Sequence, residues 1–560
     1  MCSLFGFPNF SEFKKEFEDV KEGYDEDGHS YMYHRLMSLK NLDQRIRDKL
    51  ADYDDNIRNY LQHINKKRGF KITLKYFQYL AILFTEIYLD FYFQNPIEFL
   101  NELTNFGIKN KEKYGDSIEL IAFTLRDMKN LAFWMATGSG KTLIMHINYL
   151  QFIRYNKGKH KIDYENFILI TPNAGLTYQH MKELQLSSIP CEYFLDSREY
   201  ISIDYPPIKV IEITKFTGEK KGEGKSIDIR SVTSKNIVFA DEAHKGTSGD
   251  AWRSYRERIA KSGFKFEYSA TFGQALKKVD PNDDLLQAYA KSILFDYSYK
   301  YFYSDGYGKD YRIINTKKLT EDLQYKFLLA NALSFYEQLK VYESDKNLRK
   351  NYNIERPLWV FIGSKVQPGK SKEKEQTMSD ILKVVKFLHK FLNDEKWAGD
   401  TIRKILEGKS GILDKNGNDV FAITYPETKF PYLRRSRSIN GEEIYEDMRE
   451  KIFKTKSKGA LHLVDIKNAE GEIGLKVGPF GLYFGVINIG DEKGFLKYIR
   501  NNYKGKGLVV ESDDTSQSLF EGLEKSKIDI LIGARKFVEG WNSWRVSTMG
   551  LIHMGKTEGP

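Results

Sequence analysis

The residues best suited to chemistry lie at positions 136–142, where the sequence reads Ala-Thr-Gly-Ser-Gly-Lys-Thr. An apolar run precedes this segment and an amphipathic run follows it, which predicts a glycine-rich turn between a strand and a helix. Such a turn points backbone N–H groups at a phosphate, and the helix N-terminus adds the positive end of its dipole. Met135 stands where the strict eight-residue pattern has glycine. We expect an ATP-phosphate site formed by Thr137, Gly138, Ser139, Gly140, Lys141 and Thr142, with Lys141 on the phosphates and Thr142 on Mg²⁺.

Two adjacent carboxylates, Asp241 and Glu242, follow directly after the apolar run Ile237–Ala240. The carboxyl ends of parallel strands are where ligands bind in α/β sheets. Paired carboxylates in such a place are costly unless a cation or a proton is involved. We interpret Asp241 as a second Mg²⁺ ligand and Glu242 as the group that orients or deprotonates the attacking water. The alternative is a solvated acidic turn.

The elements that would position these groups come from two sets of short apolar runs, which predict two α/β domains with parallel sheets. The first set is Leu131–Ala136, Phe167–Ile170, Ile237–Ala240 and Phe264–Ser269, and the second is Leu358–Ile362, Val486–Ile489, Leu508–Val510 and Ile530–Ile532. Before them, residues 43–64 carry apolar side chains at helical spacing, which predicts a helical accessory segment. We predict domain boundaries at 1–68, 69–300 and 301–560.

Composition limits the classes of protein to which the chain can belong. Its two cysteines, Cys2 and Cys191, provide neither a disulfide framework nor a four-ligand zinc site, which favours a reducing, cytoplasmic compartment. The most apolar helical stretch, Leu80–Phe93, is interrupted by Glu86 and Asp90 and is too short and too charged to cross a membrane. The formal charge of +10 permits nucleic-acid binding without demonstrating it.

Taken in order, the phosphate-loop segment, the Asp-Glu-Ala-His segment and the tripeptide Ser269-Ala270-Thr271 resemble the motifs of superfamily 2 helicases of the DEAD/DEAH type. The stretches 291–297, 305–309, 471–478 and 532–545 are most similar to the restriction-subunit group, the motor subunits of type III restriction enzymes. The resemblance covers roughly residues 70–560 and implies two RecA-like domains that bind ATP and Mg²⁺.

The resemblance also implies roles for residues outside the phosphate site. His244 joins Lys141, Asp241 and Glu242 in the catalytic group, while Ser269 and Thr271 couple the nucleotide state to movement of the second domain. Gln78 reads adenine through its amide, although a place on a helix surface is the alternative. Gly540 lies in the fifth motif, which faces nucleotide and nucleic acid. The expected nucleic-acid contacts are Thr171, Pro172, Thr214, Lys215, Ser364 and Lys365.

Two departures from the family pattern concern hydrolysis. Asn542 stands where the family has aspartate, so a charged contact to ATP or Mg²⁺ is lost. The family's sixth motif, which supplies arginine fingers, would follow shortly after Pro560, where the sequence stops. Because an arginine finger contributes roughly 10³- to 10⁵-fold in turnover, we expect a fragment of a longer protein that binds ATP but hydrolyses it slowly on its own.

The function expected from these motifs is an ATP-dependent motor on double-stranded DNA in a restriction or phage-defence system. A strand-separating helicase on DNA or RNA is one alternative. An ATP-gated nucleic-acid clamp with little hydrolysis is another. The resemblance implies a methyltransferase or specificity subunit as a partner, and it implies no membrane association.

Overall fold

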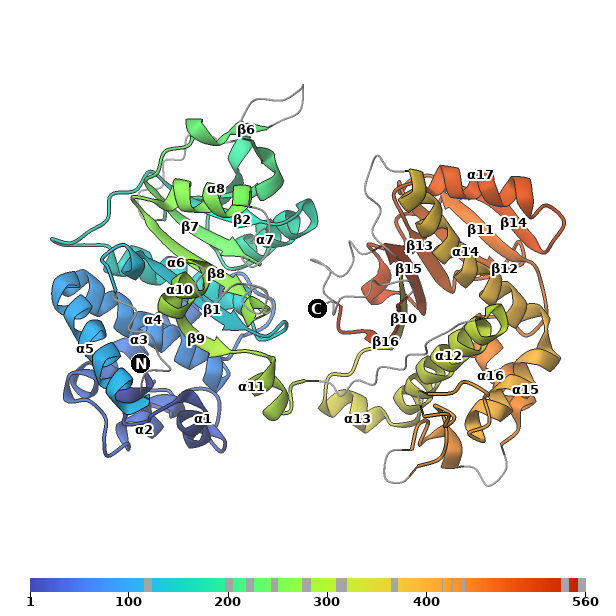
Figure 1. Ribbon diagram of the computed structural model, residues 1–560, viewed down its shortest axis with the longest axis horizontal. Coiled ribbons are helices and arrows are strands. Elements are labelled where there is room, and N and C mark those ends of the chain that lie inside the picture. The colour runs from blue at the N-terminus through green and yellow to red at the C-terminus, as the bar shows by residue number, and fades with distance from the viewer. Residues whose placement is uncertain are drawn as a thin grey trace. The chain divides into compact units, whose positions relative to one another are not determined.

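The structure is a computed structural model that describes most of the chain. The described residues are 1–114, 123–196, 205–217, 226–242, 250–273, 284–308, 320–363, 371–414, 416–424, 428–435, 439–534 and 543–551. The chain forms two compact units, Met1–Asp310 and Tyr311–Gly559 (Figure 1).

The first unit is built on a seven-stranded sheet in the order β3-β4-β2-β7-β8-β1-β9, in which every neighbouring pair is parallel. Its strands are β1 (Asn130–Met135), β2 (Asn166–Thr171), β3 (Cys191–Tyr193), β4 (Ile208–Glu212), β7 (Asn236–Asp241), β8 (Phe264–Ser269) and β9 (Ile293–Tyr297). The apolar runs form strands because both faces of the sheet are covered, so nearly every position is buried. Only β8 lies between β1 and β7, so the loops after β1 and β7 meet at one edge.

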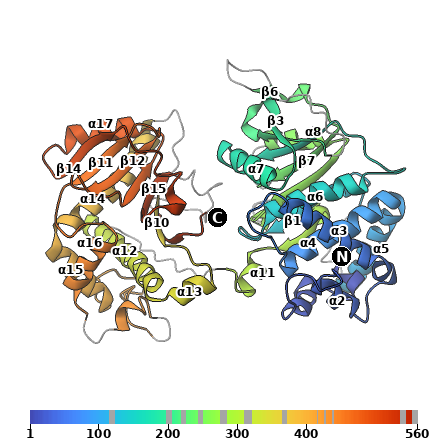
Figure 2. The ribbon, with the colours of Figure 1, turned by 180° about the vertical axis from the view of Figure 1, so that it is seen from behind.

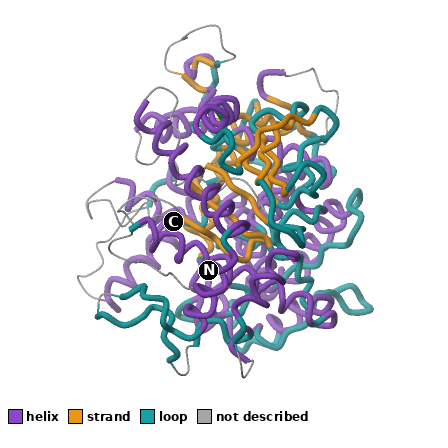
Figure 3. Tube along the Cα trace, turned by 90° about the vertical axis from the view of Figure 1, so that its right-hand side faces the viewer, coloured by secondary structure: helices purple, strands orange, loops and turns teal. Residues whose placement is uncertain are grey.

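Helices follow the strands and cover the sheet. They are α6 (Lys141–Tyr155), α7 (Ala174–Leu186), α8 (Asp250–Ala260), α10 (Asp284–Ser292) and α11 (Tyr299–Ser304). A separate two-stranded sheet joins β5 (Phe216–Thr217) to β6 (Ile227–Asp228). In Figure 3 the strands, drawn in orange, alternate along the trace with purple helices.

The N-terminal segment is helical, as predicted, and shares one hydrophobic core with the first sheet. Its helices are α1 (Phe10–Phe13), α2 (Tyr31–Met37) and α3 (Gln44–Asn65), and two further helices, α4 (Tyr76–Gln94) and α5 (Pro96–Tyr114), follow it before the first strand. All seven apolar positions that define the periodicity of residues 43–64 are buried in α3. Helices α3, α4 and α6 pack against one another (Figure 2).

The two acidic residues that interrupt the apolar stretch in α4 are buried and hydrogen-bonded. Glu86 accepts bonds from Gln151 Nε2 at 2.8 Å and Tyr155 Oη at 2.7 Å, both on α6. Asp90 accepts from Lys49 Nζ at 2.6 Å. Helix α4 is therefore joined to α6 through Glu86 and to α3 through Asp90.

The second unit holds another seven-stranded sheet, in the order β14-β11-β12-β13-β15-β10-β16. Its strands are β10 (Leu358–Gly363), β11 (Leu461–Ile466), β12 (Glu472–Val477), β13 (Gly485–Asn488), β14 (Leu508–Asp513), β15 (Ile530–Ala534) and β16 (Val546–Leu551). Its longer helices are α12 (Glu321–Ser344), α13 (Lys346–Asn351), α14 (Ser371–Asn393), α15 (Glu395–Leu406), α16 (Gly441–Lys451) and α17 (Glu492–Asn502).

The second sheet corrects one detail of the prediction. It is mixed rather than wholly parallel, because β12 runs antiparallel to both of its neighbours, β11 and β13. The remaining neighbours are parallel, as expected. The strand β12 lies within residues 471–478, one of the four stretches that resemble the restriction-subunit group.

Candidate functional site

The segment 136–142 forms a tight turn between β1 and α6. Ser139 donates from its backbone N–H and from its hydroxyl to the carbonyl oxygen of Ala136, at 3.2 and 2.7 Å. Gly138 and Gly140 have φ angles of 85° and 93°, in the left-handed region that favours glycine. Helix α6 begins at Lys141 directly after Gly140. The turn therefore has the strand–loop–helix context expected of a phosphate site.

Lys141 lies between this turn and the end of β7. Its Nζ is 3.3 Å from the carbonyl oxygen of Met135 and 3.9 Å from Glu242 Oε1. The Lys141 side chain is 10% exposed, so the charge is screened only partly by water. The lysine at the start of α6 and the carboxylate after β7 therefore lie at the same edge of the sheet.

Asp241 is held by a residue that the sequence analysis did not identify. His180 of α7 donates from Nε2 to Asp241 Oδ2 at 2.9 Å, and its side chain is 3% exposed. Burial opposes ionisation of Asp241, but the bond from His180 and the charge of Lys141 outweigh it and lower the pKa of Asp241. Asp241 is therefore an ionised carboxylate in a nearly dry setting.

No sequence pattern pointed to His180, because it is a lone histidine in an amphipathic helix. Its position follows from the sheet order: β2 pairs with β7, so the helix that follows β2 starts beside the end of β7. Behind it lies His146 of α6, fully buried, whose Nδ1 is 2.8 Å from Ser187 Oγ. Burial and the neighbouring His180 lower the pKa of His146, so His146 is neutral.

Glu242 adopts a conformation that is rare for a side chain other than glycine. Its φ is 50°, and its N–H donates to Asp241 Oδ1 at 3.0 Å. A non-glycine residue in the left-handed region costs on the order of 1 kcal/mol, and such residues cluster at functional sites. His244, the other member of this motif, lies outside the described residues.

Ser269 and Thr271 lie at the end of β8, between the two strands that carry the phosphate turn and the carboxylates. The Thr271 N–H donates to Ser269 Oγ at 3.0 Å. Ser269 is fully buried, and within the described chain the buried Thr271 Oγ1 has no hydrogen-bond partner. This hydroxyl is therefore available to a group that enters the site.

Gln78 contacts the phosphate turn directly, although it precedes the turn by 61 positions in the chain. Its Nε2 donates to the carbonyl oxygen of Ser139 at 2.9 Å, and its Oε1 accepts from the Lys75 N–H at 3.0 Å. A Cβ at Gly140 would lie 2.4 Å from Gln78 Nε2, so only glycine allows this approach. Helices α4 and α5 occupy part of the intervening chain. The contact of Gln78 with adenine stays a prediction.

The predicted strand-contacting residues differ in exposure. Thr171 is 1% exposed and its Oγ1 bonds to Thr177 Oγ1 at 2.5 Å, so its side chain points into the unit. Pro172 is half-buried, whereas Thr214 and Lys215 are exposed. Ser364 and Lys365 lie outside the described residues, and so does Gly540.

The oxygen donors at this site suit Mg²⁺. Magnesium prefers carboxylate, hydroxyl, water and phosphate oxygens, and it usually keeps several waters, so one or two protein ligands suffice. Asp241 supplies an ionised carboxylate, and Thr142 stands in the first turn of α6. In the described part of the chain, no group of three or more His, Cys, Asp or Glu is arranged to hold a metal.

Comparison with known proteins supports the resemblance. Residues 97–274 match the profile of a family described as "Type III restriction enzyme, res subunit". Over these residues the chain is similar to the restriction-subunit group, and the fold of both units is α/β. No curated protein matches the chain.

Solved structures give more distant likenesses. The helicase domain of Hef from Pyrococcus furiosus has 13% identity and a TM-score of 0.29, covering 75% of this chain and 86% of that one. A fragment of a putative HsdR subunit of a type I restriction enzyme from Vibrio vulnificus has 10% identity and a TM-score of 0.29, covering 97% and 81%. Dbp5 of S. cerevisiae, bound to RNA and ADP BeF3, has 11% identity and a TM-score of 0.23, covering 75% and 84%.

Across the described residues, no helix combines sufficient length with sufficient apolar character to cross a bilayer.

Proposed function

We propose that this chain is an ATP-dependent motor that acts on nucleic acid, with ATP held at the turn between β1 and α6. The observation that carries the proposal is the convergence of Lys141 and Glu242, 3.9 Å apart, beside a buried and ionised Asp241. A cation facing two carboxylates at the end of a parallel sheet is the arrangement that phosphoryl transfer from a nucleotide requires.

The roles follow from the positions of these side chains. Lys141 leaves its contact with the Met135 carbonyl to bind phosphate oxygens. Asp241 and Thr142 would hold Mg²⁺, which neutralises phosphate charge when it is bound. Glu242 accepts a hydrogen bond from the attacking water and orients it toward the terminal phosphorus. Gln78, anchored to Ser139, presents its amide to the adenine.

Ser269 and Thr271 connect the nucleotide to movement in this proposal. Ser269 is the last residue of β8 and Thr271 follows two positions later, and β8 is hydrogen-bonded on one side to β1 and on the other to β7. A shift at either neighbouring strand end therefore reaches Thr271, whose buried hydroxyl is available for a new bond. His244 and Gly540 belong to the same site by their motifs.

The proposed substrate is double-stranded DNA, and the proposed setting is a restriction or phage-defence system with a methyltransferase or specificity subunit. The family match over residues 97–274 supports this choice. Pro172, Thr214 and Lys215 would contact mainly the sugar–phosphate backbone of the nucleic acid. Such contacts position a protein on the duplex without reading the base sequence. Binding should therefore be salt-sensitive and show little sequence preference.

The test is steady-state ATP hydrolysis with double-stranded DNA, single-stranded DNA and RNA, beside displacement of a strand from a forked duplex. A duplex translocase is stimulated most by double-stranded DNA and leaves the fork intact. Strand release at the fork would replace this proposal with the strand-separating helicase. Equal hydrolysis with and without any nucleic acid would refute a nucleic-acid motor.

A further inference from the structure

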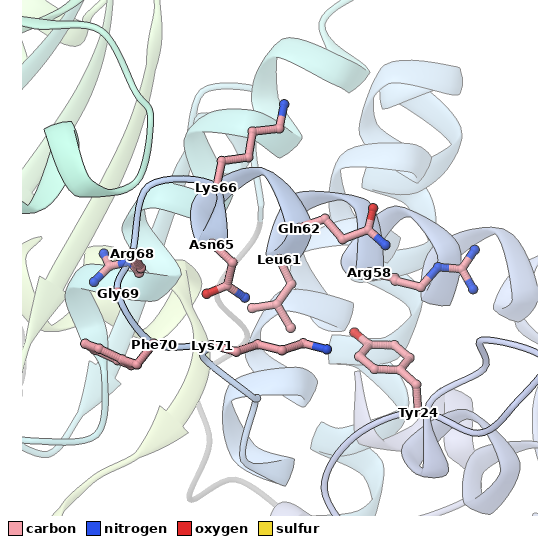
Figure 4. A pocket seen from close by; sticks show the side chains of 10 residues that line it. All are labelled: Tyr24, Arg58, Leu61, Gln62, Asn65, Lys66, Arg68, Gly69, Phe70 and Lys71. Carbon is pink, nitrogen blue, oxygen red and sulfur yellow. The ribbon is translucent and has the colours of Figure 1, made fainter.

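A cavity of about 560 Å³ lies outside the candidate nucleotide site, between the C-terminal half of α3 and the loop 66–75. Arg58, Lys66, Arg68 and Lys71 contribute four cations to its lining, and none of the described residues that line it is acidic (Figure 4). The volume is within the range of small-ligand pockets. The positive charge of the lining favours an anionic ligand.

The two arginines build the walls of this cavity. Arg68 donates from Nη2 to Glu183 at 3.0 Å and to Ser187 Oγ at 2.8 Å, which fixes the loop to the end of α7. Arg58 pairs with Asp55 at 2.8 Å. Both guanidinium groups therefore already have partners within the protein.

The lysines of the same loop are not paired in this way. Lys66, Lys67 and Lys71 are exposed, and no acidic side chain of the described chain lies within 4 Å of any of them. Figure 4 shows Lys71 extending toward the ring of Tyr24, while Lys66 points in a different direction. The charges are therefore spread along the loop instead of converging on one point, which suits successive phosphates better than a single one.

Phe70 adds an aromatic surface between these lysines. It is 69% exposed, and within the described residues its ring stacks on no other ring. In Figure 4 the ring stands at the opposite end of the cavity from Tyr24. An aromatic side chain left in water beside unpaired cations is the combination that binds single-stranded nucleic acid, because bases stack on the ring while lysines contact phosphates.

We propose that this cavity and the loop beside it form a second nucleic-acid site, which binds a single-stranded segment through Lys66 and Lys71 of the lining and Lys67 of the adjoining loop, and stacks a base on Phe70. Gln62, an exposed amide on the lining, is placed to contact base edges. The proposal goes beyond the motor function, because these residues lie outside every motif of the nucleotide site and outside the predicted strand contacts. A free nucleotide offers the same phosphate and base chemistry, so the experiment separates the two sources.

The experiment follows intrinsic fluorescence of the full chain carrying Phe70→Trp, with the unsubstituted chain and its six tryptophans as background. Titration with a twelve-nucleotide oligo-dT should quench the added fluorescence. Three lysine–phosphate contacts predict a slope of about −2 for log affinity against log salt. Adding Lys66→Ala and Lys71→Ala should weaken binding roughly 25-fold at 0.1 M salt and bring the slope to about −0.7.

A matched control removes the same charge elsewhere. Lys159 and Lys161 are exposed in the loop after α6, so Lys159→Ala with Lys161→Ala should leave affinity and slope unchanged. Equal weakening by the control pair would overturn the site, since general charge attraction would then explain binding. Saturation by dTMP at the same concentration as by the oligonucleotide would overturn a strand as the ligand.

The outcome is also separable from that of the motor proposal. If nucleic acid stimulates ATP hydrolysis while the Phe70→Trp fluorescence stays constant, the second site is refuted and the motor stands. If the fluorescence responds while hydrolysis is not stimulated, the second site stands and the motor proposal fails. The exposed position of Phe70 makes loss of folding an implausible cause of either result.

Discussion

Replacing His180 tests whether the Mg²⁺ carboxylate depends on a residue outside the motifs. His180→Leu keeps much of the side-chain volume and removes the donor that bonds Asp241 Oδ2 at 2.9 Å. A hydrogen bond to a charged group contributes about 1.5–3 kcal/mol, and Asp241 is only 10% exposed, so water replaces the donor poorly. If this energy holds Asp241 in its active position, the turnover number falls roughly 10- to 150-fold.

The assay compares Mg²⁺-dependent ATP turnover with nucleotide binding in the absence of metal. Binding without metal should change little, because Lys141 and the glycine turn are untouched. His180→Gln restores a neutral donor of similar reach and should recover most of the turnover. Thermal melting of each variant confirms that the first unit is folded. Unchanged turnover in His180→Leu would refute the positioning role, and equal losses in both variants would show that the imidazole acts in some other way.

Three further predictions concern affinity, pH dependence and stability. Gln78→Ala should weaken ATP binding about 5- to 10-fold in equilibrium titrations, since one hydrogen bond contributes about 1 kcal/mol. The same substitution should leave GTP binding unchanged. Equal losses of affinity for both nucleotides would contradict the contact with adenine. Burial raises the pKa of Glu86 above its ordinary value of 4.5, so the folded state keeps a proton that the unfolded state loses. The Tm of the protein should therefore fall relative to that of Glu86→Gln as pH rises above 4.5. A difference in Tm between the two proteins that stays constant from about pH 4.5 to 7 would contradict this. Asp529 is fully buried and accepts hydrogen bonds from Arg356 Nε at 2.7 Å and Arg356 Nη2 at 2.9 Å. Asp529→Ala should therefore lower the free energy of unfolding of the second unit by about 3–5 kcal/mol, measured with denaturant. ATP binding by the first unit serves as the internal control.

The sequence was sufficient to predict those elements whose local residue pattern coincides with their buried positions. Strand β8 has the predicted bounds Phe264–Ser269, and the apolar positions of α3 are all buried. Lys141 and Glu242 could be placed together because parallel strands bring their carboxyl ends to one edge. These features depend on periodicity and on chain order, both of which can be read without coordinates.

Other features could not be predicted because they depend on tertiary packing. His180 reaches Asp241 only because β2 and β7 are neighbours, and the order of strands is not written in any local pattern. The contact between Gln78 and Ser139 spans 61 positions, so spacing alone left a helix surface as an alternative. Strand β12 was not among the predicted apolar runs, and its antiparallel direction could not be predicted because strand direction leaves little trace in composition.

The central claim is that the turn at Lys141 and the carboxylates of β7 form one ATP-hydrolysing site that nucleic acid activates. Steady-state hydrolysis should therefore be measured with and without double-stranded DNA, for the unsubstituted chain and for Lys141→Ala. We predict hydrolysis that DNA stimulates and that Lys141→Ala abolishes. Stimulated hydrolysis that persists in Lys141→Ala would contradict this assignment, whereas tight ATP binding without turnover in either condition would replace the motor with the ATP-gated clamp.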